Sequence, residues 1–415
     1  MTCMRVPCKS SLLFLTLALA AIAAFVHPPA LTAGAAAEAA WSVDVISDAA
    51  TVSFPSNITF TLELESQIPV AEIRLYSKVV GQDVAFYSYP ELQGDRRIQA
   101  TYTLYTSGRE YIPPGTQIEY WYTLYDGHGN SVQTPAQSFT YLDTRFDWRV
   151  TPIGSVDIYW YGDASTDLAL LKPGLEKALQ RIEQVLQVTP SERFRGLIYN
   201  SAADAAQAFP TVSATLQREQ LFAGYAFSDK GVFLGVDMAH YLIVHEATHL
   251  YTGLFMGSAS ALLPTWVEEG LAVYLQAPTN SYAGLLGSLR GEDLLPLRAM
   301  ESLPGLSAEI RLFYAQAPTV VAYMIQVHGE EKFRAFLSQF KMGARVDEAL
   351  QATYGFGVKE LDTLWRGNLS GVVNESPFDV NFWLITVPSA ALALLAVATM
   401  VVLGTRYVRR RVRGH

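Results

Sequence analysis

The spacing of apolar residues changes along this chain of 415 residues, most clearly near residue 141. From 41 to about 141, apolar and polar residues alternate, as in "ITFTLELE" at 58–65. Alternation places successive side chains on opposite faces of a β-strand. Turn sequences such as "PPG" at 113–115 separate these runs. Short alternating strands with this punctuation are typical of a β-sandwich, so we predict an all-β domain over 41–145.

Beyond this region the pattern mixes strands with helices. A strand pattern in "SVDIYWYG" at 155–162 is followed by helical periodicity to about 187, and the chain is almost wholly helical from 308 onward. Apolar residues recurring every three or four positions indicate amphipathic helices. We therefore predict an α+β domain over 146–370.

Both ends of the chain are strongly apolar. Residues 1–40 combine a basic start, an apolar run and small residues, which predicts a secretory signal peptide; an uncleaved anchor is the alternative. Residues 382–404 carry no charge and are long enough to span a bilayer. The basic tail 405–415 predicts a cytoplasmic C-terminus, with 371–381 as a linker. The sequence thus predicts a single-pass cell-membrane protein that contacts the lipid bilayer through its C-terminal helix and exposes its N-terminal ectodomain outside the cytoplasm.

Charge and cysteine content exclude some classes of function. The net charge is −9, and the most basic segments lie at the two ends, so the region between them is more acidic still. An acidic surface argues against nucleic acid as a partner. Cys3 and Cys8 are the only cysteines. Both precede the apolar run, so the mature chain would have neither disulfides nor thiolate metal ligands.

The stretch "LIVHEATHLYTG" at 242–253 carries the strongest chemical signal. His245 and His249 are four residues apart, so on a helix their side chains project over the same patch and can share one metal ion. Glu246 is rotated about 100° from His245 and can reach a water on that ion. In H-E-x-x-H the two histidines bind zinc and the glutamate is the general base. We expect one Zn²⁺ per chain, and Asp237 as the N-cap of this helix.

A catalytic zinc needs a third protein ligand and one open position. Twenty residues after His249, "LPTWVEEGLAVYLQ" at 263–276 offers Glu268 and Glu269. On a helix these neighbours point about 100° apart, and spacing alone does not choose between them.

A resemblance to known families indicates which of the two carboxylates is the third metal ligand. H-E-x-x-H followed by W-x-x-E-G-x-A resembles the gluzincin zinc metallopeptidases, specifically the peptidase MA-like families in their bacterial membrane-anchored form. The resemblance covers roughly 155–367 and implies a thermolysin-like fold with Glu269, directly before the glycine, as the third ligand. It also implies a tyrosine that stabilises the oxyanion. Tyr314 resembles that position, with Tyr323 as the rival.

Two further segments have a predicted role in binding or architecture. "YIPPGTQIEYWYTLYDGHGN" at 111–130 resembles an immunoglobulin or fibronectin module. The segment 223–236 is expected to form a hairpin. Its last strand is either the sheet edge along which gluzincins lay a peptide, or an ordinary sheet strand.

The predicted fold class is therefore multidomain. An immunoglobulin/fibronectin-like sandwich is followed by a gluzincin domain and a transmembrane helix. We expect a zinc-dependent peptidase acting on a peptide or protein substrate. The alternatives are a non-catalytic zinc-binding sensor ectodomain and an adhesion protein in which the motif is incidental.

Overall fold

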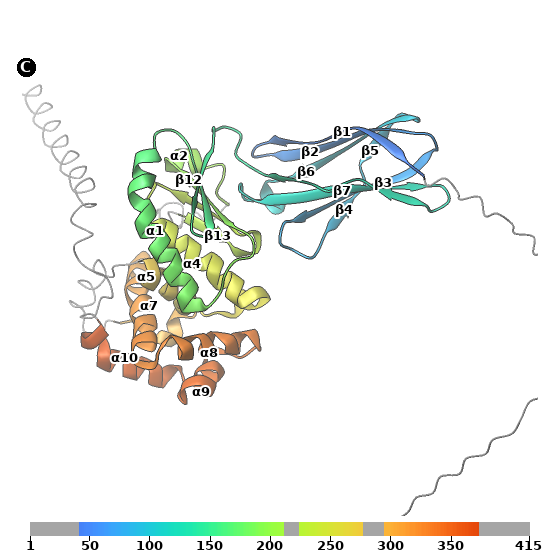
Figure 1. The fold of residues 1–415 in the computed structure, drawn as a ribbon. Coiled ribbons are helices and arrows are strands. Elements are labelled where there is room, and N and C mark those ends of the chain that lie inside the picture. Colours follow the sequence, from blue (N-terminus) through green and yellow to red (C-terminus); the bar gives the residue numbers. More distant parts are fainter. Residues whose placement is uncertain (1–40, 211–223, 277–293, 373–415) are drawn as a thin grey trace, which may run out of the picture. The chain divides into compact units, whose positions relative to one another are not determined.

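The structure, a computed structural model, describes residues 41–210, 224–276 and 294–372. Within them, a β-rich N-terminal region is followed by a region that becomes helical toward its C-terminal end (Figure 1).

The N-terminal region contains two antiparallel sheets. The first has the strand order β1-β2-β6-β5, formed by Val43–Ser53, Asn57–Ser66, Arg97–Tyr105 and Glu91–Gln93. The second has the order β4-β3-β7-β8, with β9 also paired to β7; these strands are Phe86–Ser88, Val70–Val79, Gln117–Asp126, Ser131–Gln133 and Gln137–Thr140. Alternate residues of β2 and β7 are buried, and the rings of Phe60 and Tyr120 meet edge to face with centroids 4.9 Å apart. The predicted alternation therefore corresponds to inward-facing side chains of two sheets packed on each other.

The second region contains a five-stranded sheet with the order β10-β11-β12-β14-β13. Its strands are Arg149–Ile153, Val156–Trp160, Phe194–Tyr199, Val232–Val236 and Gly224–Phe227. The three central strands are parallel, whereas β10 and β13 run antiparallel to their neighbours. Every residue of β12 is buried, as expected for a strand covered on both faces.

Helices account for the rest of this region. They are α1 Ser165–Leu186, α2 Ala202–Ala205, α4 His240–Met256, α5 Thr265–Gln276, α7 Ser307–His328, α8 Glu330–Lys341, α9 Val346–Tyr354 and α10 Val358–Val372. A shared hydrophobic core joins α1, the sheet, α4, α5 and the C-terminal helices. Helix α5 packs against both α4 and α7.

Gly270 sets the distance between α5 and α7. A Cβ atom at Gly270 would lie 2.6 Å from the backbone oxygen of Ala317, closer than real contacts of this kind. Only a glycine therefore allows the two helices to approach this closely. Ala317 is about one helical turn from Tyr314, so the same contact brings Tyr314 next to α5.

The predicted fold class and membrane location need correction. Within 41–210, 224–276 and 294–372, no helix is both long and apolar enough to cross a bilayer. Even α7, with 22 residues, interrupts its apolar residues with polar ones such as Arg311 and Gln316. The segment predicted to span the membrane, 382–404, lies outside the described residues, as do the predicted signal peptide and basic tail. The described structure thus has a β-rich and a helical region and no membrane-spanning helix.

Two local predictions can be compared with the structure. The segment 223–236 contains the predicted hairpin, and its last strand, β14, is an ordinary sheet strand, because it pairs in parallel with β12 on one side and with β13 on the other; the edge of the described sheet is the first strand, β13. Asp237 does not cap α4. Its φ is +69° and its N–H donates to Tyr199, so the chain turns there, and the helix begins at His240 with Ala239 as N-cap.

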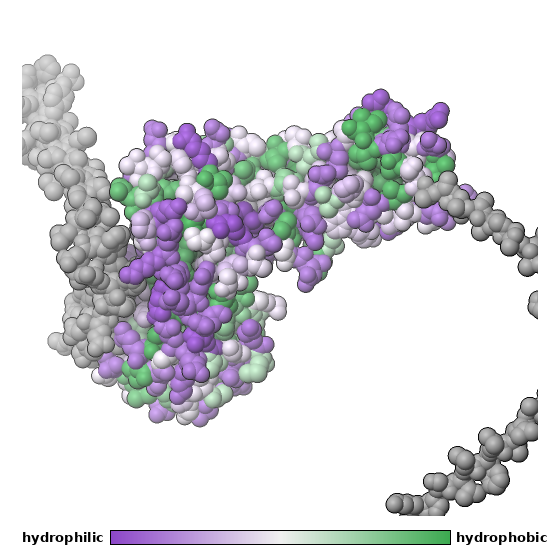
Figure 2. Space-filling model, in the orientation of Figure 1, coloured by the Kyte–Doolittle hydropathy of each residue, from purple (hydrophilic) through white to green (hydrophobic). Residues whose placement is uncertain are grey.

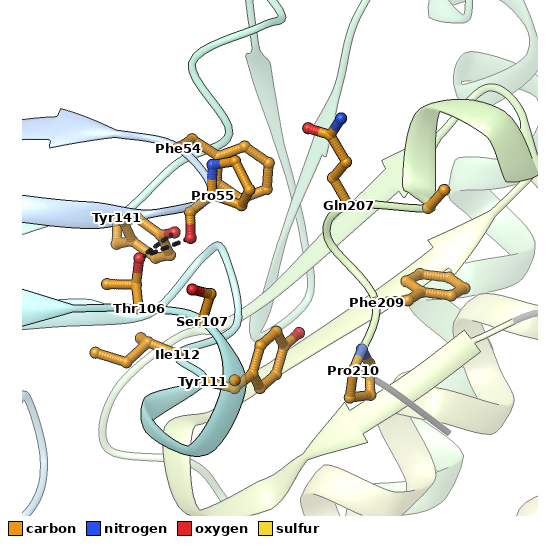
Figure 3. A pocket seen from close by; sticks show the side chains of 12 residues that line it. Phe54, Pro55, Thr106, Ser107, Tyr111, Ile112, Tyr141, Gln207, Phe209 and Pro210 are labelled. Atoms are coloured by element: carbon orange, nitrogen blue, oxygen red, sulfur yellow. Dashed lines mark hydrogen bonds between the residues drawn. The ribbon is translucent and has the colours of Figure 1, made fainter. Parts of the chain in front are cut away.

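A cavity of about 300 Å³ is lined by the turn after β1, the loop 106–112 and residues 206–210 (Figure 3). Beside it, Thr106 donates to the carbonyl of Pro55 at 2.9 Å, and Tyr141 donates to Thr106 at 3.1 Å. None of the predicted site residues lines it.

We expect Gly270→Ala to lower the free energy of unfolding by about 1–2 kcal/mol. The cost of overpacking a helix interface exceeds the gain of about 1 kcal/mol in helix propensity. Gly367→Ala is the matched control, because a Cβ there, on α10, would meet nothing within 4 Å. The control should be as stable as wild type or slightly more so in urea unfolding. Equal stability of the two variants would contradict the proposed helix contact.

Candidate metal centre

The two histidines of the motif lie on α4, a helix that is held rigidly. Leu242, Ile243 and Val244 are almost fully buried, so the helix cannot rotate without exposing apolar surface. The Nε2 atoms of His245 and His249 face each other at 3.2 Å. Two imidazole nitrogens this close point toward a common position.

Glu269, on α5, completes a group of three. Its Oε2 is 3.4 Å from Nε2 of His245, and its Oε1 is 3.9 Å from Nε2 of His249. One ligand atom from each residue lies within 4.8 Å of the other two.

These separations fit a metal ion. Two ligand atoms at about 2.0–2.1 Å from a tetrahedral ion are about 3.3 Å apart, close to the values here. In addition, Oε2 of Glu269 is buried and accepts no hydrogen bond. A buried carboxylate oxygen without a donor is an unfavourable arrangement that a cation would relieve. The donor set and its geometry therefore suit an ion held by nitrogen and oxygen.

The structure also shows which of Glu268 and Glu269 faces the cluster, a choice that the sequence spacing left open. Oε1 of Glu268 lies 3.4 Å from Nδ1 of His249, on the side of the ring away from the cluster. Nδ1 of His245 is 2.7 Å from Oε1 of Gln276. Each histidine therefore has a partner behind it that can fix the orientation of its ring, as is usual for metal-binding histidines.

Gln276 was not predicted from the sequence. It is the last residue of α5, 31 positions from His245, and no local pattern marks it as a partner of the histidine. The helical phase of α5 gives a weak signal, because Gln276 lies seven residues, or two turns, after Glu269 on the same helix face.

Glu246 is 6% exposed and lies against the edge strand β13. A Cβ atom at Gly224 would be 2.6 Å from Oε1 of Glu246 and 2.8 Å from its Cγ. The absent side chain at Gly224 therefore provides the space that the Glu246 carboxylate occupies. Gly224 is a second residue that sequence reasoning missed.

The structure places the two candidate tyrosines differently. Tyr314 forms a hydrogen bond with Glu269, which puts its hydroxyl at the cluster. Tyr323 is 5% exposed, and its ring packs against His328 with centroids 5.9 Å apart.

Burial and charge compete at the cluster. Burial raises the pKa of Glu246, against the opposing effect of His245 and His249. Burial also acts to raise the pKa of Glu269, but the charge of His249, the neighbouring His245 and the hydrogen bond from Tyr314 outweigh it and lower that pKa to about 2. Burial would lower the pKa of His249, yet Glu269 and Glu268 raise it to about 9. The cluster thus holds a proton that metal binding would displace.

Among the residues that the structure describes, three other histidines lie outside this cluster. His240 is half-buried in the first turn of α4, and partial burial lowers its pKa. His328 packs among aromatic rings, including Tyr354 at 5.0 Å. His128 lies in a turn, where its N–H donates to Asp126.

Comparison with protein-family models matches residues 176–371 to a family described as the Peptidase MA superfamily. The matched span contains α4, α5 and α7, and therefore the whole cluster. A domain of this superfamily supports a peptidase and confirms the coarser part of the resemblance seen in the sequence. No curated protein matches the chain.

Several solved structures show weak likeness. An aminopeptidase N family protein from Idiomarina loihiensis is 9% identical, with coverage of 80% of this chain and 71% of that chain and a TM-score of 0.31. Catalytically inactive OgpA from Akkermansia muciniphila, in complex with an O-glycopeptide, is 12% identical, with coverage of 25% and 30% and a TM-score of 0.20. A β-1,3-glucan-binding domain of carbohydrate-binding module family 56 is 19% identical, with coverage of 24% and 98% and a TM-score of 0.16. At these TM-scores none of the likenesses establishes a shared fold.

We expect the chelator-treated chain to take up one Zn²⁺, measured by titration against a competing indicator. His249→Ala and Glu269→Gln should abolish stoichiometric binding, because each removes one of three ligands. Glu268→Gln is the matched control one residue away. It should still bind one ion, about 10- to 100-fold more weakly, because it only loses the partner behind His249. Loss of binding in Glu268→Gln with retention in Glu269→Gln would reverse the assignment.

Proposed function

We propose that this protein is a zinc-dependent peptidase that hydrolyses peptide bonds. The observation that carries the proposal is the convergence of His245, His249 and Glu269, with Glu246 beside them on the same helix. The match of the surrounding span to the Peptidase MA superfamily supports it.

Zinc suits the three proposed ligands better than the common alternatives do. Two imidazoles and one carboxylate are a catalytic zinc ligand set, whereas magnesium and calcium prefer oxygen ligands alone. Three protein ligands leave one of four tetrahedral positions open. When bound, zinc would supply an activated water and polarise a substrate carbonyl.

The chain's own residues would then carry the proton transfers and hold the substrate. The Glu246 carboxylate takes the proton of the attacking water and returns it to the leaving amine nitrogen. The Tyr314 hydroxyl donates to the Glu269 carboxylate and is therefore in reach of the site; it would turn its single O–H from Glu269 to the oxyanion as negative charge develops. Glu268 and Gln276 hold the histidine rings in place throughout.

The edge strand β13 offers a place for the substrate. It ends the described sheet, and its residue Gly224 touches Glu246. A peptide added alongside an edge strand pairs with it through backbone hydrogen bonds. Such a peptide would run past the general base, so one of its carbonyl groups would lie near the cluster.

We expect Glu246→Gln to lose peptide cleavage by about 10²- to 10⁴-fold, because the amide cannot accept the proton. It should still bind one Zn²⁺. The measurement is cleavage of casein and a broad fluorogenic peptide library, with zinc content determined on the same samples. A wild-type chain that binds zinc and cleaves none of these substrates would favour a zinc-binding protein without catalysis. Full activity in Glu246→Gln would refute the assignment of the base.

Two further substitutions test the positions around the base. Tyr314→Phe should lower kcat by about 10²- to 10³-fold with little change in KM, because it removes one oxyanion donor. Tyr323→Phe is its matched control on the same helix and should retain activity. Gly224→Ala should lower kcat while zinc binding persists, because the new methyl group displaces the Glu246 carboxylate. Equal activity of both tyrosine variants would place the oxyanion donor elsewhere.

A further inference from the structure

A row of aromatic side chains crosses the outer face of the second sandwich sheet. In the strand register Tyr87 of β4 lies opposite Tyr76 of β3, and Tyr76 lies opposite Trp121 of β7. The neighbouring residues Leu75 and Tyr122 are buried in the core, so the row is on the opposite, outer face. Ring centroids are 5.8 Å apart between Tyr87 and Tyr76 and 5.5 Å apart between Tyr76 and Trp121.

Arg74 extends this row into a platform. Its guanidinium carbon lies 4.6 Å from the ring centroid of Tyr125, 5.5 Å from that of Tyr87 and 6.0 Å from that of Tyr89. Cation–π contacts of this kind hold the rings in place on the sheet. Tyr87 and Tyr89 are still 53% and 58% exposed. We call Tyr76, Tyr87, Tyr89, Trp121 and Tyr125 the aromatic platform.

The charges on this face neutralise each other. Arg74 forms an ion pair with Glu72, and Lys78 pairs with Glu119 at 3.2 Å. The four side chains keep between 28% and 37% of their surface exposed, so their polar atoms remain accessible for hydrogen bonds. The face therefore combines aromatic rings with hydrogen-bonding groups and carries no excess of either charge.

We infer that the aromatic platform binds a neutral carbohydrate chain. The electron-rich faces of tyrosine and tryptophan attract the partly positive C–H groups on the flat side of a pyranose ring. Sugar hydroxyl groups in turn require donors and acceptors, which the four ion-paired side chains provide at the edges of the platform. Several rings on adjacent strands suit a ligand that repeats the same unit along its length. Tyrosine and tryptophan also lose little side-chain entropy on binding.

Other occupants fit this face less well. Nucleic acid also stacks on aromatic rings, but its phosphates need cations, and both basic side chains here already pair with glutamates. A membrane surface favours an apolar face with unpaired basic residues around it. On the side drawn in Figure 2, apolar residues lie in separate patches among hydrophilic ones. A neutral ligand matches the balanced charge of the platform.

The test uses the full chain on a microarray of neutral and charged glycans, followed by calorimetry with the glycan bound best. Wild type should bind at least one neutral glycan, and Tyr87→Ala/Tyr89→Ala should weaken that binding at least 10-fold. Tyr105→Ala is the matched control, because Tyr105 is 64% exposed and lies on β6 of the other sheet. It should bind like wild type, as should Glu246→Gln, because this site is independent of the proposed peptidase.

Three results would overturn the inference. One is the absence of binding to every neutral glycan on the array. The second is binding that the Tyr87/Tyr89 double variant leaves unchanged. The third is stronger binding to single-stranded DNA or phosphatidylcholine vesicles than to any neutral glycan. Because Tyr87 and Tyr89 are more than half exposed, their replacement should leave the fold intact, which circular dichroism of the variant verifies.

Discussion

The candidate metal centre depends on how closely α5 can approach the helices on either side of it. Gly270 allows the backbone of α7 to come within a distance that any side chain would prevent, and this brings Tyr314 to the Glu269 carboxylate. On its other side α5 packs against α4, which carries the two histidines. The carboxylate of one helix and the imidazoles of another can meet only because both helices are fixed by a common core.

The contact between the Glu269 carboxylate of α5 and the two imidazoles of α4 concentrates charge at a place from which water is largely excluded. Burying unpaired charges is costly. Most of the charged side chains in the cluster are therefore paired with a hydrogen-bonding or oppositely charged partner. His249 lies between Glu268 and Glu269, whereas His245 has the neutral amide of Gln276 behind it. One carboxylate oxygen of Glu269 still lacks a hydrogen bond. A divalent cation at the point where the three side chains converge would satisfy this oxygen and displace the proton that the cluster otherwise holds.

Local spacing predicts only part of this arrangement. The separation of His245 and His249 is enough to place both on one face of a helix. Spacing could not decide which of Glu268 and Glu269 faces inward, because the rotation of α5 about its axis is set by its packing against α4 and α7. Gly224 and Gln276 escaped prediction for a related reason, since their contacts join residues 22 and 31 positions apart. The hairpin at 223–236 was predicted, but the edge position of β13 depends on which strand pairs with β12. The membrane-spanning helix inferred from composition is absent from the described structure.

The central claim is that His245, His249 and Glu269 hold one zinc ion in front of Glu246. Anomalous diffraction at the zinc absorption edge, from crystals of the zinc-loaded protein, tests it most directly. The account predicts one strong anomalous peak about 2.0–2.2 Å from Nε2 of both histidines and from a carboxylate oxygen of Glu269. An ion coordinated by Glu268 in place of Glu269, or no anomalous peak between α4 and α5, would contradict the account.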